Sequence, residues 1–298
     1  MAQVRNNVEQ QGVLPLDCPL RGEIRGERSI MDFPFFALEK KTLLDEIEHS
    51  VGSTSIKIRA GGGGIATMYD KEILLYGASL ICERMRRGEE VTQEIVFTAH
   101  DFFRATGTRN PGKRNYDRFN EALSRLQGTQ IQTNLKTGGQ IHRGWFSWVE
   151  NAQAVYDDGS ATGIERLRAV KLRLCDFLFR AIQRDQQIYS YHHDYFRLGL
   201  IERRIYEIAR SHCDEGPYAV PLDELYAAVG TRTAIRKFKA QLMEMEEQNA
   251  LPQYTVTVRE NTEGTSKRAK ASETIVTLAE RPRELVTILP SMYEAIAA

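Results

Sequence analysis

The residues best suited to catalysis form a cluster of histidines and tyrosines at positions 189–195. His192 and His193 are adjacent and precede Asp194, with tyrosines at three neighbouring positions. Nickases of rolling-circle replication bind a metal through two histidines that flank an apolar residue and use a tyrosine as the nucleophile. Adjacent histidines in an extended chain point in opposite directions. We therefore expect a linker strand here, with no metal ligands and no catalytic residues; an origin-nicking enzyme is the less favoured alternative.

A second candidate is the segment Gly107–Lys113, which has the GxxxxGK spacing of a phosphate-binding loop. Such a loop follows a strand directly and needs Ser or Thr after the lysine to hold magnesium. Arg114 takes that position, and the residues before Gly107 have a helical pattern. No paired carboxylates and no Ser-His-Asp arrangement stand out. The sequence predicts a protein that is not an enzyme and uses no cofactor.

Residues from about 112 to 126 predict a helix with two opposite faces. Successive helical residues advance by about 100° around the axis, and this spacing separates basic from apolar side chains. The basic side and the start of the helix carry Arg109, Lys113, Arg114, Arg118 and Arg125. The other side carries Tyr116, Phe119, Leu123 and Leu126. One face therefore predicts packing on a core, and the other predicts contact with DNA phosphates or base edges.

A second helix, expected from about residue 232 to 248, repeats this division. Its start and N-terminal half carry Thr231, Arg232, Arg236, Lys237 and Lys239. A polar loop further on carries Lys267, Arg268 and Lys270. A single basic helix face is usually only a solvated surface, and a polar loop of this kind is equally consistent with a solvated tip. Two such helices in the same context favour DNA binding.

The elements around these helices indicate a fold of the α+β class. A helix, a short strand, a short helix, a long helix and a hairpin (residues 129–135 with 140–149) occur in that order, and the order recurs from about residue 194. This order is typical of the winged-helix form of the helix-turn-helix, whose last helix reads DNA. The sequence predicts two tandem winged-helix domains, at residues 30–184 (with connecting strands) and 185–285. Residues 1–29 are expected to be a flexible arm and residues 286–298 a C-terminal tail.

Composition limits the functional class further. Lys plus Arg and Asp plus Glu both number 40, so the formal net charge is zero. This excludes a uniformly basic polymer binder but allows a local basic face. The four cysteines form no CxxC pair, which argues against a cysteine zinc site or a disulfide framework. The N-terminal residues contain no apolar leader. The most apolar stretch, Ile73–Ile81, is far shorter than the ~20 residues that a bilayer crossing needs. We therefore expect the chain to be cytoplasmic and to have no membrane contact.

Several sequence blocks occur together in one order: MDFPFFALEK at Met31–Lys40, ATMYDKEILL at Ala66–Leu75, NYDRFNEALSRLQ at Asn115–Gln127 with Thr129, FSWVE at Phe146–Glu150, YFRL at Tyr195–Leu198, IER at Ile201–Arg203 and LPQY at Leu251–Tyr254. In these blocks and their order the chain resembles the replication initiator protein A family of bacterial plasmids. The resemblance covers nearly the whole chain from Met31 onward. One departure is Ala37, where the family normally has serine, and we expect it to affect only local capping.

The resemblance implies a bacterial protein that binds repeated sites in the double-stranded DNA of a plasmid origin. It also implies that replication starts with host proteins, such as the host initiator and the replicative helicase. Analogy with related initiators suggests a homodimer and repression of the protein's own promoter. A winged-helix transcriptional repressor without initiator activity is the alternative, because both functions use the same DNA-binding chemistry.

Overall fold

The computed structural model describes residues 16–141, 143–157, 166–260 and 273–282. In the N-terminal half the helices are α1 (Ser29–Asp32), α2 (Lys71–Arg86), α3 (Ala99–Ala105), α4 (Lys113–Gly128), α5 (Asp176–Arg180) and the π-helical turn η1 (Ala181–Asp185). The strands there are β1 (Arg25–Glu27), β2 (Ile47–Val51), β3 (Thr54–Arg59), β4 (Glu94–Phe97), β5 (Gln130–Thr133), β6 (Lys136–Thr137), β7 (Gln140–Ile141), β8 (Phe146–Ser147), β9 (Val149–Asp157) and β10 (Arg166–Leu174). The mixed α and β character agrees with the expected fold class.

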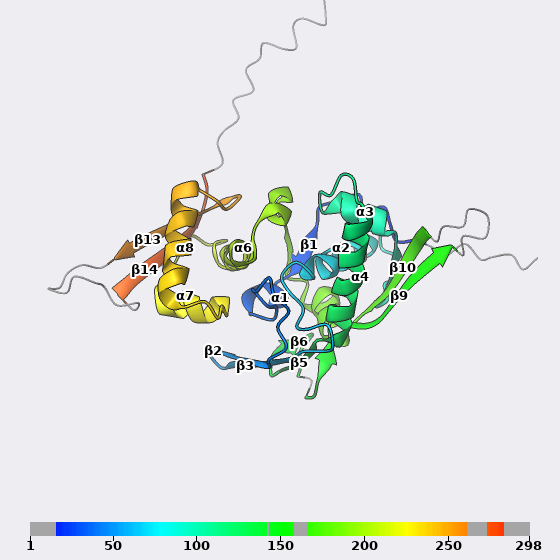
Figure 1. Cartoon of the computed structure of the whole chain (residues 1–298), viewed down its shortest axis with the longest axis horizontal. Helices are drawn as coiled ribbons and strands as arrows, with labels where there is room; N and C mark the ends of the chain where they lie inside the picture. Colours follow the sequence, from blue (N-terminus) through cyan, green and yellow to red (C-terminus); the bar gives the residue numbers. More distant parts are fainter. Residues whose placement is uncertain (1–15, 142, 158–165, 261–272, 283–298) are drawn as a thin grey trace, which may run out of the picture.

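The C-terminal half repeats this mixture on a smaller scale. It contains β11 (Ile188–Ser190), the 3-10 turn η2 (His193–Arg197), α6 (Leu200–His212), β12 (Tyr218–Pro221), α7 (Leu222–Val229), α8 (Ile235–Gln248), β13 (Tyr254–Glu260) and β14 (Thr274–Glu280). In Figure 1, α7, α8, β13 and β14 lie on one side, and α2, α3, α4, β9 and β10 lie on the other, with α6 and α1 between them.

Two groups of elements have the same order along the chain and the same strand order in their sheets. The first unit consists of α2, β4, α3, α4, β9 and β10, and the second unit of α6, β12, α7, α8, β13 and β14. The first sheet has the order β4-β10-β9 and the second β12-β14-β13, with antiparallel pairing throughout. In each sheet the strand that lies between the first two helices pairs with the last strand of the unit. The repeat is therefore one of topology, and not only of helix spacing.

The hairpin expected directly after the first long helix is present, but it does not complete the first unit. β5 pairs with β8, Gln130 beside Ser147, and it also pairs with β3, whose residues precede β5 by about seventy positions. Together with β2 these strands form a four-stranded sheet, and β6 and β7 pair only with each other. The hairpin that completes the first unit is β9–β10, in a stretch where the sequence suggested connecting strands. Local alternation marked the strands correctly, but strand partners depend on contacts distant in sequence.

The described part of the expected N-terminal arm is packed and not loose. β1 pairs with β11, from Arg25 beside Ser190. Leu20 is buried, and its main-chain N–H donates to Asp101 Oδ2 at 2.9 Å. The polar composition hid these apolar and hydrogen-bonded anchors. Residues 1–15 and the expected tail at 286–298 lie outside the described residues.

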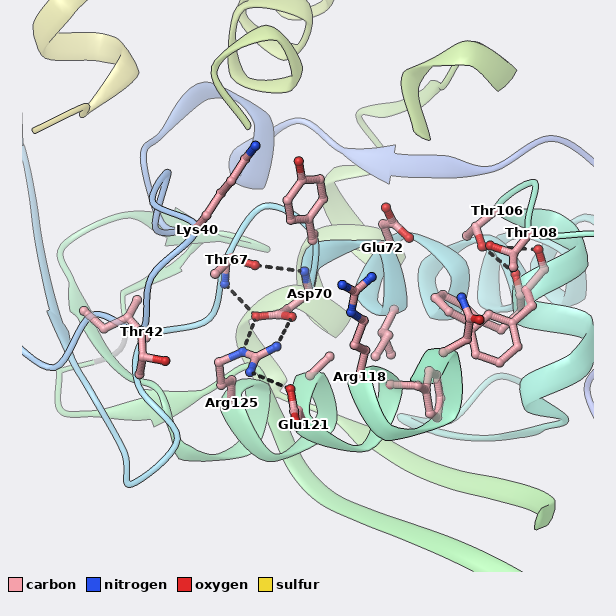
Figure 2. Close-up of a pocket in the computed structure, with 18 of the residues that line it drawn as sticks. Lys40, Thr42, Thr67, Asp70, Glu72, Thr106, Thr108, Arg118, Glu121 and Arg125 are labelled. Carbon is pink, nitrogen blue, oxygen red and sulfur yellow. Dashed lines mark hydrogen bonds and ion pairs between the residues drawn. The ribbon is translucent and has the colours of Figure 1, made fainter. Parts of the chain in front are cut away.

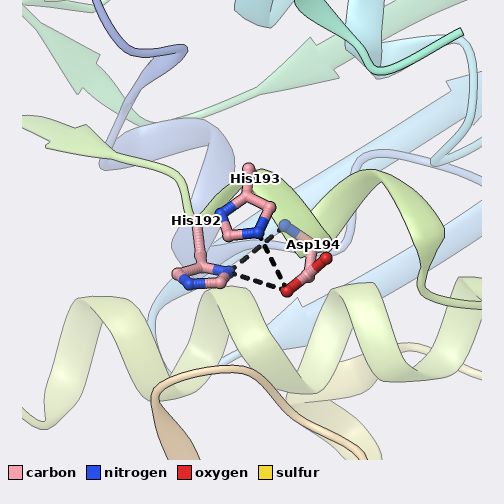
Figure 3. A group of neighbouring side chains, drawn as sticks. All are labelled: His192, His193 and Asp194. Atoms are coloured by element: carbon pink, nitrogen blue, oxygen red, sulfur yellow. Dashed lines mark hydrogen bonds and ion pairs between the residues drawn. The ribbon is translucent and has the colours of Figure 1, made fainter. Parts of the chain in front are cut away.

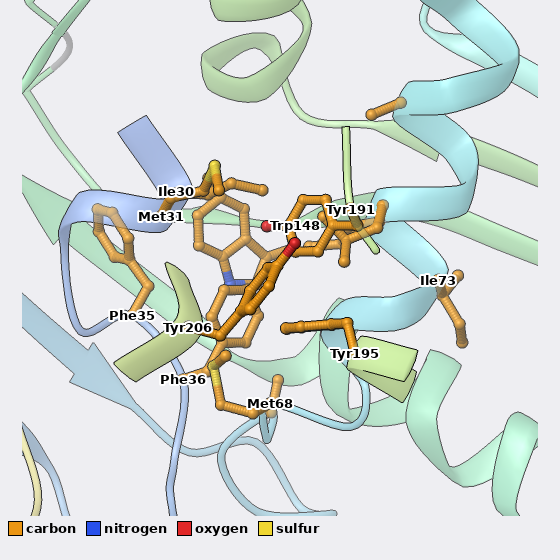
Figure 4. Packing of buried hydrophobic residues seen from close by; sticks show 14 of the residues in the cluster. Ile30, Met31, Phe35, Phe36, Met68, Ile73, Trp148, Tyr191, Tyr195 and Tyr206 are labelled. Carbon is orange, nitrogen blue, oxygen red and sulfur yellow. The ribbon is translucent and has the colours of Figure 1, made fainter. Parts of the chain in front are cut away.

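One continuous hydrophobic core extends through both units. Trp148 is completely buried at its centre, with the Phe36 ring stacked at 5.2 Å and the Phe35 ring edge-on at 5.3 Å. Figure 4 shows these rings beside Tyr191, Tyr195 and Tyr206. Two of the sequence blocks quoted above, MDFPFFALEK and FSWVE, thus meet in the core. Buried aromatic pairs of this kind add about 0.5–1.5 kcal/mol each beyond their buried area.

Buried charges connect the two units through this core. Lys71 at the start of α2 and Glu207 in α6 are both fully buried, and Lys71 Nζ lies 2.7 Å from Glu207 Oε1. The hydroxyls of Tyr191 and Tyr195 also donate to Glu207 Oε1, each at 2.9 Å. Burial lowers the pKa of Lys71 to about 8, against the opposing attraction of Glu207. Removing one partner would leave a buried charge without compensation.

The four cysteines are free thiols, and three of them, Cys82, Cys175 and Cys213, are buried. They serve as small core residues, as expected. Within the described ranges, none of the helices combines the length and the apolar character needed to cross a membrane.

Candidate nucleic-acid interface

Helix α4 holds the predicted basic face on a firmly packed support. At its N-terminus the Asn115 side chain accepts a hydrogen bond from the Gly112 main-chain N–H at 3.1 Å, which helps to define the start. Phe119, Leu123 and Leu126 are buried, as the spacing predicts. The support orients the opposite side of the helix toward solvent.

Most of the predicted DNA-binding residues of the first unit are exposed. Arg109 lies in the turn before α4, and Lys113, Arg114 and Arg118 lie in its first two turns. Lys113 forms a surface ion pair with Asp117 at 2.9 Å, which contributes little because both groups are well solvated. Within the described residues, no carboxylate is within ion-pair distance of Arg109, Arg114 or Arg118. These three guanidinium groups are thus available to an external anion.

Arg125 differs from the other predicted basic residues. Its Nε and Nη2 donate to the two carboxylate oxygens of Asp70, each at 2.8 Å. Asp70 is 3% exposed, and the fork of hydrogen bonds raises the pKa of Arg125. A bidentate pair with a buried acid fixes the guanidinium. Arg125 is therefore committed to joining α4 to α2 and is a poor candidate for reading DNA.

A cavity of about 630 Å³ lies beside the basic face of α4. Figure 2 shows Arg118 pointing into it, with Arg125 held on Asp70 further along the helix and Lys40 across the opening. Lys41 lines the same cavity, and both lysines are exposed. No local pattern associates these lysines with α4, because more than seventy residues separate them from Arg118. The fold adds two cations to this surface.

The second unit presents a smaller basic surface at the start of α8. This helix begins at Ile235, three residues later than expected, so Arg232 lies in the preceding turn. Arg236 and Lys237 occupy its first turn and are exposed. As in the first unit, neither has a carboxylate within ion-pair distance in the described part of the chain. Phe238, Leu242 and Met245 are buried on the other side.

The remaining predicted residues around α8 have contacts within the protein. Thr231 is 7% exposed, and its hydroxyl accepts the N–H of Thr233 at 3.2 Å, so it shapes the turn. Arg232 lies 3.5 Å from Asp45 in the segment before β2. Lys239 pairs with Glu260 and donates to Thr274 at 3.2 Å. Thr231 and Lys239 are therefore poor candidates for DNA contact, whereas Arg232 remains half exposed.

Lys267, Arg268 and Lys270 fall outside the described residues, although the strands on either side, β13 and β14, form the expected hairpin. The segment Gly107–Lys113 follows helix α3 and not a strand. That placement disagrees with a phosphate-binding loop of the nucleotide-binding kind.

Comparison with known proteins defines the class. A family model described as "Replication initiator protein A" matches residues 25–256. A relative named "Putative replication protein", from Wigglesworthia glossinidia brevipalpis, is 30% identical over 235 residues, covering 78% of this chain and 84% of the relative. The family match covers the first unit and the second unit as far as the start of β13. The chain is a replication initiator.

More narrowly, the chain belongs to the replication initiator protein A family. Its fold is similar to that of domains 2 and 3 of RctB, as seen in two crystal structures. One has a TM-score of 0.57 at 15% identity, and the other a TM-score of 0.52 at 14% identity. Each alignment covers 84% of this chain and 95% of the RctB chain. At such low identity the likeness concerns the fold alone.

Proposed function

We propose that the protein initiates plasmid replication by binding repeated sites in the double-stranded DNA of the origin through two winged helices. In each unit a helix, a strand, two helices and two strands follow one another, and the first strand pairs with the last. In proteins with a helix-turn-helix the second helix of the motif enters the major groove. By this assignment α4 and α8 are the two recognition helices, and β9–β10 and β13–β14 are the wings.

The observation that carries the proposal is the same in both units. The first two turns of α4 expose Arg114 and Arg118, and the first turn of α8 exposes Arg236 and Lys237. These cations lack partners among the described acidic residues, although the chain as a whole is neutral. Cations near a recognition helix N-terminus contact phosphates and the O6 and N7 atoms of guanine. Arg109, Lys113 and Arg232 flank these positions and complete the proposed surface.

We further propose that the protein acts by recruitment and without catalysis. Its partners would be the host initiator and the replicative helicase, and a homodimer would be the form that represses its own promoter. The supporting argument is chemical: the exposed cations of α4 and α8 are binding groups for an anionic partner, and binding alone requires no bond to be made or broken.

A combined binding and replication experiment tests the proposal. DNA flanking the gene would be footprinted with the wild-type protein, with the double variant R118A/R236A and with R87A. Arg87 is a half-exposed arginine at the C-terminal end of α2, outside both proposed recognition helices, and serves as the matched control. We expect protected direct repeats with the wild type and R87A, and none with the double variant.

The same three proteins would then be supplied to a host that carries the origin on a plasmid lacking the gene. Plasmid maintenance by the wild type and R87A alone would support the initiator function. Specific DNA binding without maintenance would indicate the repressor function instead. DNA binding that survives in the double variant would refute the assignment of α4 and α8.

A further inference from the structure

The segment His192–Asp194 brings three metal-binding side chains together. His192 Nδ1 lies 3.7 Å from Asp194 Oδ2, and His193 Nε2 lies 3.2 Å from the same oxygen. Each residue offers one ligand atom, a ring nitrogen or a carboxylate oxygen, and these three atoms lie within 4.8 Å of one another. Figure 3 shows both rings turned toward the Asp194 carboxylate. The expectation that the adjacent rings diverge is wrong.

The backbone explains why the rings converge. His192 is extended, with ψ 144°, whereas His193 begins the 3-10 turn η2. The change of conformation between the two residues removes the alternation that a strand would impose. The ring centroids are consequently only 4.2 Å apart.

The spacing suits a tetrahedral ion. Zinc binds nitrogen and carboxylate oxygen at about 2.0–2.2 Å, so two ligands of a tetrahedral site lie about 3.3–3.5 Å apart. The two measured separations, 3.2 and 3.7 Å, bracket this value. The third separation joins the two histidine nitrogens. The His193 side chain is 77% exposed, so small rotations of its ring can adjust this separation.

The ligand atoms are also in the right chemical state. His192 Nδ1 accepts the main-chain N–H of Asp194 at 3.2 Å, so this nitrogen carries no proton and its lone pair points toward Asp194. This bond is long, and an incoming ion would replace it. Arg197 lies 2.9 Å from Asp194 Oδ1 and orients the carboxylate, which leaves Oδ2 toward the rings.

Hydrogen bonds to buried groups hold the segment His192–Asp194 in place. The His192 main-chain N–H donates to the Tyr206 hydroxyl at 3.0 Å, and that hydroxyl donates to Gln253 Oε1 at 2.9 Å. Tyr206 is completely buried in the core. The first ligand thus rests on a rigid support, which lowers the cost of ordering the site on binding.

We propose that His192, His193 and Asp194 bind a divalent transition-metal ion of the zinc type, with water at the fourth position. The histidines open onto a cavity of about 390 Å³, which has room for that water. Arg104 and Arg210 line the same cavity, and their charge weakens the attraction for a cation. We therefore expect micromolar and not nanomolar affinity. The site lies at the junction of β11 and α6, away from α4 and α8.

Titration of the full-length protein with zinc tests the site, with the cysteines kept reduced by a phosphine. Calorimetry should show one equivalent bound by the wild type. H193A and D194N should each weaken binding at least about tenfold. H100A removes an exposed histidine on α3 and should leave binding unchanged. Circular dichroism of each variant checks the fold. We expect H193A to fold normally, because the His193 side chain is exposed.

Cobalt serves as a second probe because its spectrum reports its ligands. Visible absorption without a sulfur-to-cobalt charge-transfer band is expected for nitrogen and oxygen ligands. Absence of binding, equal binding by H193A and the wild type, or a sulfur band would each overturn the proposal; the last would assign the ion to cysteines.

Discussion

The two units expose similar basic residues near their long helices, but the basic residues that form ion pairs within the protein have different partners. In the first unit Arg125, late in α4, is bound to Asp70 of the same unit. In the second unit Arg232, before α8, reaches Asp45, which lies before β2 in the N-terminal half. The cations without a carboxylate partner among the described residues are Arg109, Arg114 and Arg118, before α4 and in its first two turns, and Arg236 and Lys237 in the first turn of α8. The comparison shows that position along the helix, more than the count of basic residues, separates a structural cation from a candidate DNA contact.

A second difference lies between the last helix and the hairpin of each unit. In the second unit only five residues, 249–253, separate α8 from β13. In the first unit residues 129–148 intervene, and they supply four strands, β5 to β8, which belong to two sheets separate from the β4-β10-β9 sheet. The inserted strands extend the first unit beneath α4 and help to form the Trp148 core. The first unit therefore has more support, and the second depends on its contact with the first.

The largest effect should come from breaking the buried contact between the units. Glu207→Ala removes the partner of buried Lys71, which must then carry an uncompensated charge or give up its proton, so we expect the free energy of unfolding to fall by about 3–5 kcal/mol. Urea denaturation followed by circular dichroism measures this loss. The double variant K71M/E207L replaces the ion pair by apolar side chains and should recover most of it. A loss below about 1 kcal/mol for E207A would mean that the pair does not hold the units together.

A smaller effect should appear as a pH dependence of the free energy of unfolding, caused by Glu27 in strand β1. Glu27 is 2% exposed, and burial raises its pKa from 4.5 to about 7, against the lowering effect of hydrogen bonds from Ser29. The folded state thus holds a proton that the unfolded state releases between these two values. Unfolding free energy should fall by about 2–3 kcal/mol from pH 5 to pH 8 because of this group.

The variant E27Q isolates that contribution. Its stability should lack this decline, and the difference from the wild type should be constant above about pH 8. E48Q, which alters an exposed carboxylate on β2, should follow the wild-type curve. Parallel curves for E27Q and the wild type would show that Glu27 is ionised throughout.

DNA binding offers the sharpest comparison of the two units. R118A and R236A should each weaken binding to the origin site by about 1–3 kcal/mol if the side chains reach bases, and by less if they reach only phosphate. Fluorescence anisotropy measures both. R125A should leave affinity unchanged while lowering the unfolding free energy by about 1–3 kcal/mol, because Asp70 loses its charged hydrogen bonds.

Unequal results would refine the assignment. If only R118A weakens binding, the first unit alone reads the site and the second has another role. If R125A reduces affinity in a protein of normal stability, the Asp70 pair opens on DNA and our interpretation of it is wrong.

The smallest effect on sequence discrimination should come from the second hairpin. Replacing Lys267, Arg268 and Lys270 by alanine should lower affinity for specific and random DNA by similar factors, because wing cations usually contact phosphate or the minor groove. The slope of log affinity against log salt concentration, on the order of −5 in the wild type, should become shallower by about three. Loss of specific binding alone would mean that this loop reads sequence or groove shape, and no change would mean that it is only solvated.

The sequence predicted the helices better than the sheets. The spacing of Leu74, Ala78 and Ile81 places α2 correctly, and the two-faced patterns place α4 and α8 within a few residues, because helical periodicity is local. Strand partners are not local. Ile58 pairs with Ile131 and Val170 with Phe97, and nothing in the alternation of either segment specifies such partners.

The candidate site was predicted only in part for the same reason. Arg114, Arg118 and Arg236 could be placed on exposed faces from helix geometry alone. The pairing of Arg125 with Asp70, and the approach of Lys40 to α4, depend on how separate elements meet. A helical wheel shows which way a side chain points from its axis, but not which neighbouring element receives it.

The pairing of β1 with β11 also affects how the chain is made. Arg25 emerges from the ribosome about 160 residues before its partner Ser190. At synthesis rates of about 5–20 residues per second this is a delay of roughly ten to thirty seconds. During that interval Ile24 and the strand edge of β1 are exposed to other chains, and to chaperones, while downstream helices already form. Helix α2 can cover one side of β1 early, through contacts such as the Arg25 N–H on the Ser79 hydroxyl, but the strand edge is protected only once β11 has been translated.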